Sequence, residues 1–279
     1  MGMDKVAVNS KIGSLVREIA DNYKDIGNLY YFINEYDNAE NAYMDAIKVD
    51  ENYYKAHYNL GNIYFEKEDY KKAIKSWSKT IEIRPSHIKA RYNLAHTFHV
   101  KKMYEKAKEE YLEVLNISPD YGEVYNEIGM VYYDMGEYEN SLNAFMTAIK
   151  IDPDEVDTYF NVANTYYEME DYVKAATFYE VFSNKVPDET HALNNLADTL
   201  LKIGRKDEAL KVINNVLELD PEYGAAICTL GEIYETMGET KKAIENFEKS
   251  IKLTENKSLQ KHAEYKIKQF KKSKKGKKK

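Results

Sequence analysis

Few residues in this sequence have a type and spacing that could support catalysis or metal binding. His96 and His99 lie three positions apart, so both side chains could face the same side of a helix, and Glu127 is the nearest candidate for a third ligand. A zinc ion needs three or four ligands, and nothing in the sequence fixes a third one. We therefore expect the two histidines to line a polar surface and predict no metal site.

The usual catalytic motifs are absent from the sequence. It contains no glycine loop that could hold a phosphate, no His-Glu-x-x-His and no Gly-x-Ser-x-Gly. Cys228 is the single cysteine and follows Ile227, so we expect it to pack as a small apolar side chain. We predict a non-catalytic protein with no cofactor.

The positions of small, aromatic and proline residues follow a strict period of 34. The five prolines are Pro85, Pro119, Pro153, Pro187 and Pro221. One column of small residues is Gly27, Gly61, Ala95, Gly129, Ala163, Ala197 and Gly231, and a column of large residues is Tyr43, Trp77, Tyr111, Phe145, Tyr179, Ile213 and Phe247. Within each period, apolar residues recur at helical spacing in two blocks, with Gly136, Gly204 and Gly238 at the break between blocks. The sequence thus predicts pairs of helices that must stack to bury their apolar faces.

This pattern resembles the tetratricopeptide repeat family, and the second repeat shows it best, with Leu60-Gly61, Tyr64, Tyr70, Ala73, Trp77 and Pro85. The resemblance implies an all-α fold, a right-handed α-solenoid superhelix of seven helix hairpins with a C-terminal capping helix. The predicted repeats are 20–53, 54–87, 88–121, 122–155, 156–189, 190–223 and 224–257. Repeats 5 and 6 depart from the pattern at Phe182, Leu200, Lys206 and Ile213, where we expect local repacking.

The two ends of the chain need separate predictions. Residues 1–19 form an N-terminal extension that we expect to be partly disordered, although residues 10–19 could lengthen the first helix. The apolar spacing of residues 258–270 predicts an amphipathic capping helix. Residues 271–279 include seven lysines and predict a disordered, solubilising tail, which could also touch RNA, anionic lipid or the acidic end of the groove.

In the resembled family, the first helices of successive repeats line a groove that binds extended peptides. Carried over to this sequence, the groove positions also hold Tyr31, Phe65, Glu66 and Glu127. The peptide-binding residues that we predict from this resemblance are Lys24, Asn28, Lys55, Tyr58, Asn59, Asn62, Lys89, Tyr92, Asn93, His96, Asn126, Asn161, Asn164 and Asn195. The asparagine amides could hydrogen-bond to a peptide main chain whatever its side chains, or they could instead fix the packing between repeats.

A second binding mode is a carboxylate clamp of the kind that some family members use to bind acidic chaperone C-termini. The five clamp positions hold Lys24, Asn28, Asn59, Lys89 and Asn93 here, so the arginine of the family motif is replaced by Asn93. An asparagine cannot replace the bidentate guanidinium. The groove positions of the second half carry a large excess of acids, which suits basic or polar peptides instead.

The charge and hydropathy of the sequence indicate which class of partner the protein binds. The formal net charge is −7, and residues 1–270 carry 33 basic and 47 acidic residues. An acidic body does not favour nucleic acid as a partner, and no apolar run is long enough to span a membrane. We predict a cytoplasmic scaffold whose partner is another protein. The remaining alternative is a purely architectural protein whose repeats self-associate, and an oligomer is compatible with the sequence.

Overall fold

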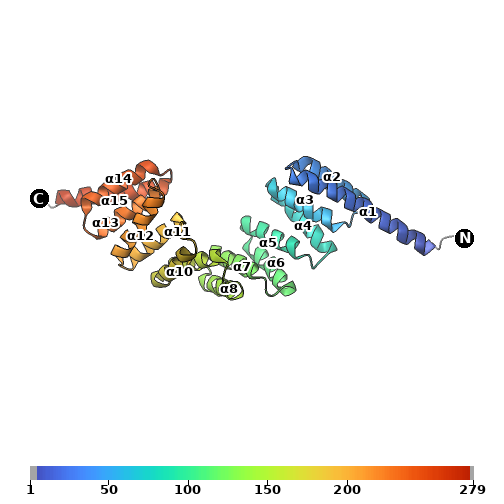
Figure 1. Ribbon diagram of the computed structural model, residues 1–279, viewed down its shortest axis with the longest axis horizontal. Coiled ribbons are helices and arrows are strands. Elements are labelled where there is room, and N and C mark those ends of the chain that lie inside the picture. The colour runs from blue at the N-terminus through green and yellow to red at the C-terminus, as the bar shows by residue number, and fades with distance from the viewer. Residues whose placement is uncertain (1–4, 277–279) are drawn as a thin grey trace. The chain divides into compact units, whose positions relative to one another are not determined.

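The computed structural model describes residues 5–276 and divides into two compact units, with unit 1 ending at Met135 and unit 2 beginning at Gly136. The regular secondary structure of residues 5–276 is entirely helical, and Figure 1 shows the helices in chain order. Unit 1 contains α1 (Lys5–Phe32), α2 (Tyr36–Val49), α3 (Tyr54–Glu66), α4 (Tyr70–Ile83), α5 (Ile88–Val100), α6 (Tyr104–Ile117) and α7 (Gly122–Asp134). Unit 2 contains α8 (Tyr138–Ile151), α9 (Val156–Glu168), α10 (Tyr172–Lys185), α11 (Thr190–Lys202), α12 (Lys206–Leu219), α13 (Gly224–Thr236), α14 (Thr240–Leu253) and α15 (Lys257–Gly276). The prediction of an all-α repeat fold is confirmed.

The turn between the two helices of a repeat has the same backbone conformation each time. The residue in this turn has a φ between 57° and 80°, in the left-handed region, and the step from one such residue to the next is 34. The residues are Asn34, Glu68, Lys102, Gly136, Glu170, Gly204 and Gly238. Glycine adopts this conformation without the penalty that a Cβ atom brings, which explains why three of the seven turns carry it.

The column of small residues on the first helices exists because aromatic rings lie directly against it. A methyl group on Gly61 would lie 2.3 Å from the indole nitrogen of Trp77, and a methyl group on Gly27 would lie 2.4 Å from the ring of Tyr43. Trp77 and Tyr43 are both almost fully buried, and Trp77 Nε1 also donates a hydrogen bond to the carbonyl oxygen of Tyr58 at 3.2 Å. In these two repeats the ring of the second helix is therefore seated on the bare backbone of the first helix.

Repeats 5 and 6 repack around larger side chains where they depart from the family pattern. Phe182 packs against the ring of Phe160, with a centroid distance of 5.3 Å. Leu200 and Ile213, which replace two aromatic residues, are buried in one apolar cluster with Tyr179. The loss of ring contacts in repeat 6 is thus compensated by a continuous aliphatic core in unit 2.

Both terminal helices are longer than the sequence predicted. Helix α1 begins at Lys5, so the segment expected to be partly disordered is helical wherever it is described. Helix α15 runs to Gly276 instead of ending at 270, so residues 271–276 continue the capping helix, which corrects the prediction of a disordered tail for them. An uninterrupted lysine-rich sequence contains no helix breaker before Gly276, which explains the continuation. Residues 1–4 and 277–279 lie outside the described part of the chain.

The apolar face of α15 covers the end of the last repeat. Ala263 and Ile267 of α15 are buried with Phe247 of α14, and Leu259 and Phe270 pack around them. Cys228 belongs to the same cluster, and burial raises the pKa of its thiol to about 12. This cysteine therefore packs as a small apolar side chain.

The contact between Gly61 and Trp77 gives a test of the repeat packing. Gly61→Ala forces the indole to shift and should lower the free energy of unfolding by about 1–3 kcal/mol, as overpacking in cores does. The matched control is Gly13→Ala in α1, where a methyl group would have nothing within 4 Å and helix propensity favours alanine by about 1 kcal/mol. Urea denaturation followed by circular dichroism measures both variants, and equal effects would contradict this account.

Candidate functional site

The first helices of unit 1 line two adjoining hollows. We treat the two as one surface and call it the first-helix hollow. One has a volume of about 450 Å³ and lies between α1, α2 and α3, and the other, of about 350 Å³, lies between α1, α3, α4, α5 and α7. They share Tyr31, Asn62 and Glu66 as lining residues. Of the residues predicted to bind a peptide, those that line the first-helix hollow are Asn28, Tyr58, Asn59, Asn62, Tyr92, Asn93 and His96.

The asparagines of the hollow form hydrogen bonds from one repeat to the next. Asn59 Nδ2 donates to Asn28 Oδ1 at 2.9 Å, and Asn93 Nδ2 donates to Asn62 Oδ1 at 3.1 Å. Asn28 Oδ1 also accepts a hydrogen bond from the hydroxyl of Tyr43 at 2.8 Å. Asn59 and Asn93 are partly buried, and in these bonds each uses its amide nitrogen and not its amide oxygen. The amides thus fix the spacing of the repeats and keep an acceptor available toward the hollow.

The charged groups of the first-helix hollow are carboxylates. Glu66 and Glu127 line it, and no lysine or arginine does. Glu127 accepts a hydrogen bond from the buried hydroxyl of Tyr111 at 3.0 Å, whereas Glu66 is exposed and has no ion-pair partner within residues 5–276. Burial and the negative charge of Glu66 raise the pKa of Tyr31 above its ordinary value. The hollow is therefore acidic, and the raised pKa keeps Tyr31 protonated and able to donate a hydrogen bond.

Aromatic rings supply most of the remaining surface of the hollow. Tyr31, Tyr58 and Tyr92 come from the first helices. Trp77 and Tyr43 come from the second helices, and although they belong to the packing column they also line the hollow. Sequence reasoning missed these two residues because a residue that packs between helices was assigned to the core alone.

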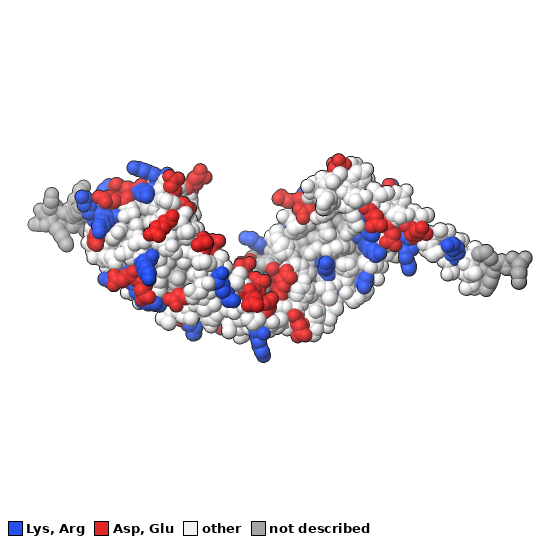
Figure 2. Space-filling model, in the orientation of Figure 1, with Lys and Arg blue, Asp and Glu red and all other residues white. Residues whose placement is uncertain are grey.

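The predicted lysines are not among the lining residues of the first-helix hollow. Lys24 Nζ lies 2.6 Å from a carboxylate oxygen of Asp25, and Lys55 Nζ lies 3.0 Å from a carboxylate oxygen of Asp21. A hydrogen bond from Tyr53, followed by one from Lys55, lowers the pKa of Asp21. Figure 2 shows this mixed patch of basic and acidic side chains where α1 passes the start of α3.

The placement of these lysines gives no support to a carboxylate clamp in the first-helix hollow. Lys24 is already paired with an acid of its own helix, and Lys89 is exposed without an ion pair among the described residues. An acidic C-terminus in the first-helix hollow would meet Glu66 and Glu127 instead of two ammonium groups.

In unit 2, the predicted asparagines are engaged to different degrees. Asn164 Oδ1 accepts a hydrogen bond from Tyr179 at 2.5 Å, and Asn195 is partly buried on α11. Asn161, and Asn126 on α7 of unit 1, each have a polar interaction within the chain. These positions stay predictions as peptide contacts.

Helix α15 places Lys266 and His262 against two of the acids at the groove positions of unit 2. Lys266 Nζ lies 2.7 Å from Glu235 Oε2, and His262 Nε2 lies 2.7 Å from Glu232 Oε1. Burial opposes the charge on Lys266, but its hydrogen bond to Glu235 outweighs this and raises its pKa. The excess of acids that the sequence shows at these positions is thus reduced by the capping helix itself.

The two histidines do not converge on one site. His99 Nε2 lies 2.9 Å from Asp134 Oδ2, while His96 packs beside the ring of Phe65 at a centroid distance of 5.7 Å. Within residues 5–276 no group of three or more histidine, cysteine or acidic residues has the arrangement of a metal site.

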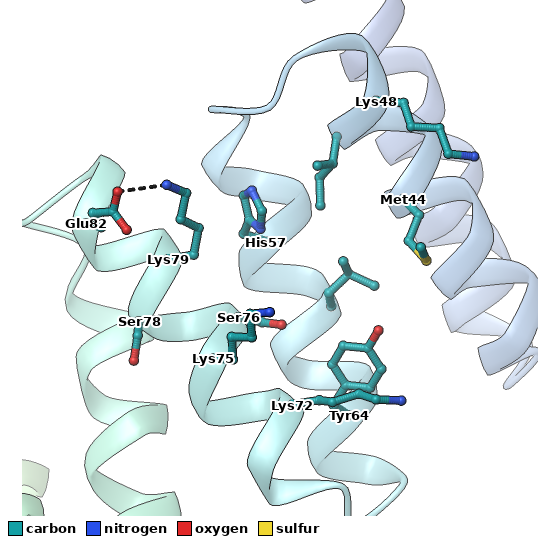
Figure 3. A pocket seen from close by; sticks show the side chains of 12 residues that line it. Met44, Lys48, His57, Tyr64, Lys72, Lys75, Ser76, Ser78, Lys79 and Glu82 are labelled. Atoms are coloured by element: carbon teal, nitrogen blue, oxygen red, sulfur yellow. Dashed lines mark hydrogen bonds and ion pairs between the residues drawn. The ribbon is translucent and has the colours of Figure 1, made fainter.

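A second hollow, of about 770 Å³, lies in unit 1 between α2, α3 and α4, outside the groove positions that the sequence indicated. Figure 3 shows Met44 and Tyr64 at its apolar surface and lysines around it, with Lys79 bonded to Glu82. Three of its four lysines are paired with acids three residues away in the sequence, at Lys48–Asp45, Lys72–Asp69 and Lys79–Glu82. These pairs cancel most of its positive charge, so we assign it no ligand.

Models of one repeat family match most of the chain. Models described as TPR repeat match residues 27–67 and 129–170, and models described as tetratricopeptide repeat match residues 54–87, 88–121, 157–189 and 188–256. The chain belongs to the tetratricopeptide repeat family. A protein-interaction scaffold is the role that this fold supports, and no helix within residues 5–276 is both long and apolar enough to cross a membrane.

Solved structures share the fold at low sequence identity. A tetratricopeptide repeat protein from Parabacteroides merdae is 17% identical, with a TM-score of 0.66 over 90% of this chain and 98% of that chain. PilF from Pseudomonas aeruginosa is 18% identical, with a TM-score of 0.63 over 81% and 99% of the two chains. MamA from Desulfovibrio magneticus is 19% identical, with a TM-score of 0.58 over 61% and 96%. No curated protein sequence matches the chain.

The buried tyrosine of the hollow gives a pH-dependent test. Burial raises the pKa of Tyr43 to about 12, above the value of about 10 that tyrosine has in an unfolded chain. The folded state therefore holds the proton more tightly, and this contribution to stability is complete below pH 10 and is lost as the pH rises toward 12. Tyr43→Phe should reduce the fall in the urea midpoint over this range, while the exposed Tyr265→Phe should not. Identical pH profiles for wild type and Tyr43→Phe would contradict the assignment.

Proposed function

We propose that the first-helix hollow of unit 1 binds an extended segment of another protein and prefers a basic or polar side chain in that segment. The observation that supports this most is the composition of its lining, which combines amides, aromatic rings and two carboxylates with no cation. Such a surface can bind a main chain through the amides and a side chain through charge. Binding of a peptide would need little movement, since helices hold the lining residues in place.

The amides suit a main chain as ligand. Asn59 and Asn93 are held at a fixed separation by their hydrogen bonds to Asn28 and Asn62. Each of the two offers an oxygen that can accept a main-chain N–H, which is independent of the peptide sequence. Affinity would come from these repeated contacts and from the aromatic surface.

The carboxylates supply the selectivity. Glu66 is exposed and without an ion-pair partner among the described residues, so it can pair with a lysine or arginine of the ligand. Tyr58, Tyr92 and Phe65 line the same hollow and can contact the aliphatic stem or the charged end of that side chain. We infer that acidic C-termini are poorer ligands than basic segments.

Peptides selected from a displayed random library with the full-length protein test this function. We expect the selected sequences to be enriched in lysine or arginine, and Glu66→Gln to weaken their binding about three- to tenfold in fluorescence anisotropy, because a hydrogen bond to a charged group is replaced by a neutral one. The matched control is Glu82→Gln at the second hollow, which should leave affinity unchanged. Far-UV circular dichroism verifies that both variants are folded.

The same peptides distinguish this function from a carboxylate clamp and from a purely architectural role. Lys24→Ala and Lys89→Ala should leave the affinity unchanged, whether the peptide ends in a free carboxylate or an amide. Selection of acidic peptides that lose affinity on either lysine substitution or on C-terminal amidation would favour the carboxylate clamp instead. Failure to select any peptide that responds to Glu66→Gln would favour the architectural role. The cytoplasmic location stays a prediction.

A further inference from the structure

Helix α1 carries an apolar stripe, interrupted only by Asn22, that the other described residues leave largely exposed. It has 28 residues, about twice as many as each of the helices α2 to α14, and its N-terminal part extends past its partner helix α2 (Figure 1). The other face packs into unit 1 through Ala20 and Gly27, which are buried. The stripe consists of Val8, Ile12, Leu15, Ile19, Asn22, Ile26 and Leu29. Its six apolar members are between 37% and 69% exposed.

The spacing within the stripe is that of a coiled-coil seam. Successive members are four and three residues apart in strict alternation, which is the heptad period of 3.5. In heptad terms, Ile12, Ile19 and Ile26 occupy the a positions, and Leu15 and Leu29 occupy d positions. Isoleucine at a with leucine at d is the combination that favours two parallel strands. The seam contains one polar member, Asn22, which is exposed and lies at a d position.

The opposite end of the repeat array shows how such a face is covered. There, α15 places Leu259, Ala263 and Ile267 against the last repeat. The first repeat has no equivalent cover within residues 5–276. An isolated helical segment of this length is marginally stable in water, and an apolar stripe of this length is uncommon on a free surface.

We propose that a second copy of this chain covers the stripe, with the two α1 helices packed side by side as a parallel two-stranded coiled coil. In this arrangement Ile12 of one copy lies beside Ile12 of the other. The flanking residues Lys11, Glu18 and Asp25 then face the e positions of the other copy, which are uncharged, so no like charges meet across the seam. The contact is isologous and closes at two copies.

This inference concerns a different surface from the first-helix hollow and does not depend on peptide binding there. The hollow is lined from the side of α1 that holds Asn28 and Tyr31, whereas the seam runs through Ile19, Asn22 and Ile26. On the face shown in Figure 2, the projecting part of α1 is mostly uncharged, in contrast to the mixed charges where it passes α3. Dimerisation through α1 would thus double the number of hollows without occupying them.

Sedimentation equilibrium of the full chain over a range of micromolar concentrations tests the proposal. We expect the mass to rise from one chain to two for the wild type. Ile12→Glu and Ile19→Glu should each raise the dissociation constant at least tenfold, because they place a charge in the seam. The matched control is Ser14→Glu, which lies on the same helix but at a c position. It should leave the dissociation constant unchanged. Asn22→Leu should lower the dissociation constant at least tenfold.

A cysteine variant tests the parallel orientation. Because Cys228 is buried, Ile12→Cys should form a disulfide between two chains on mild oxidation, and Ser14→Cys should not. A wild type and an Asn22→Leu variant that both stay monomeric at every concentration would overturn the proposal. A dimer that is insensitive to Ile12→Glu and Ile19→Glu would also overturn it, and would point to another surface. A dimer that responds to these substitutions without the Ile12→Cys cross-link would exclude the parallel arrangement.

Discussion

The fold depends on one repeated contact, in which an aromatic ring of a second helix rests on a residue without a bulky side chain in the first helix. Trp77 on Gly61, Tyr43 on Gly27 and Phe247 on Gly231 are three instances. The ring sets how closely the two helices approach, and the left-handed residue in the turn sets the angle at which the chain returns. Because both features recur every 34 residues, the first helices present the same columns from repeat to repeat.

The candidate site follows from this regularity. Asparagines at equivalent positions come within hydrogen-bond distance of those in the preceding repeat, so Asn59 bonds to Asn28 and Asn93 bonds to Asn62. The rings that hold the hairpins together also line the first-helix hollow, and the hydroxyl of Tyr43 bonds to Asn28 directly. Packing and the proposed recognition therefore use the same side chains, so the structural role of the asparagines is compatible with the binding role that we propose.

The sequence predicted the repeat fold well because its period is a property of residue type and spacing alone. It predicted the members of the hollow that lie on first helices, such as Asn62 and Tyr92, for the same reason. It could not predict the charge of the hollow, because Lys24 and Lys55 lie outside its lining, paired with Asp25 and Asp21, and the carboxylates alone define its charge. Such pairs depend on side-chain conformations that no period encodes. The lengths of α1 and α15 were also missed, since neither end carries the helix-ending signals of a repeat.

Recognition of a peptide main chain by the asparagine amides can be measured as the affinity of the full chain for one selected peptide and for analogues in which single main-chain amides are replaced by esters. Each ester removes one N–H donor and keeps the side chains. We expect at least one replacement to weaken binding about fivefold or more in the wild type and to have no further effect in Asn93→Ala or Asn59→Ala. Ester analogues that all bind as tightly as the parent peptide would contradict recognition of the main chain by the asparagine amides.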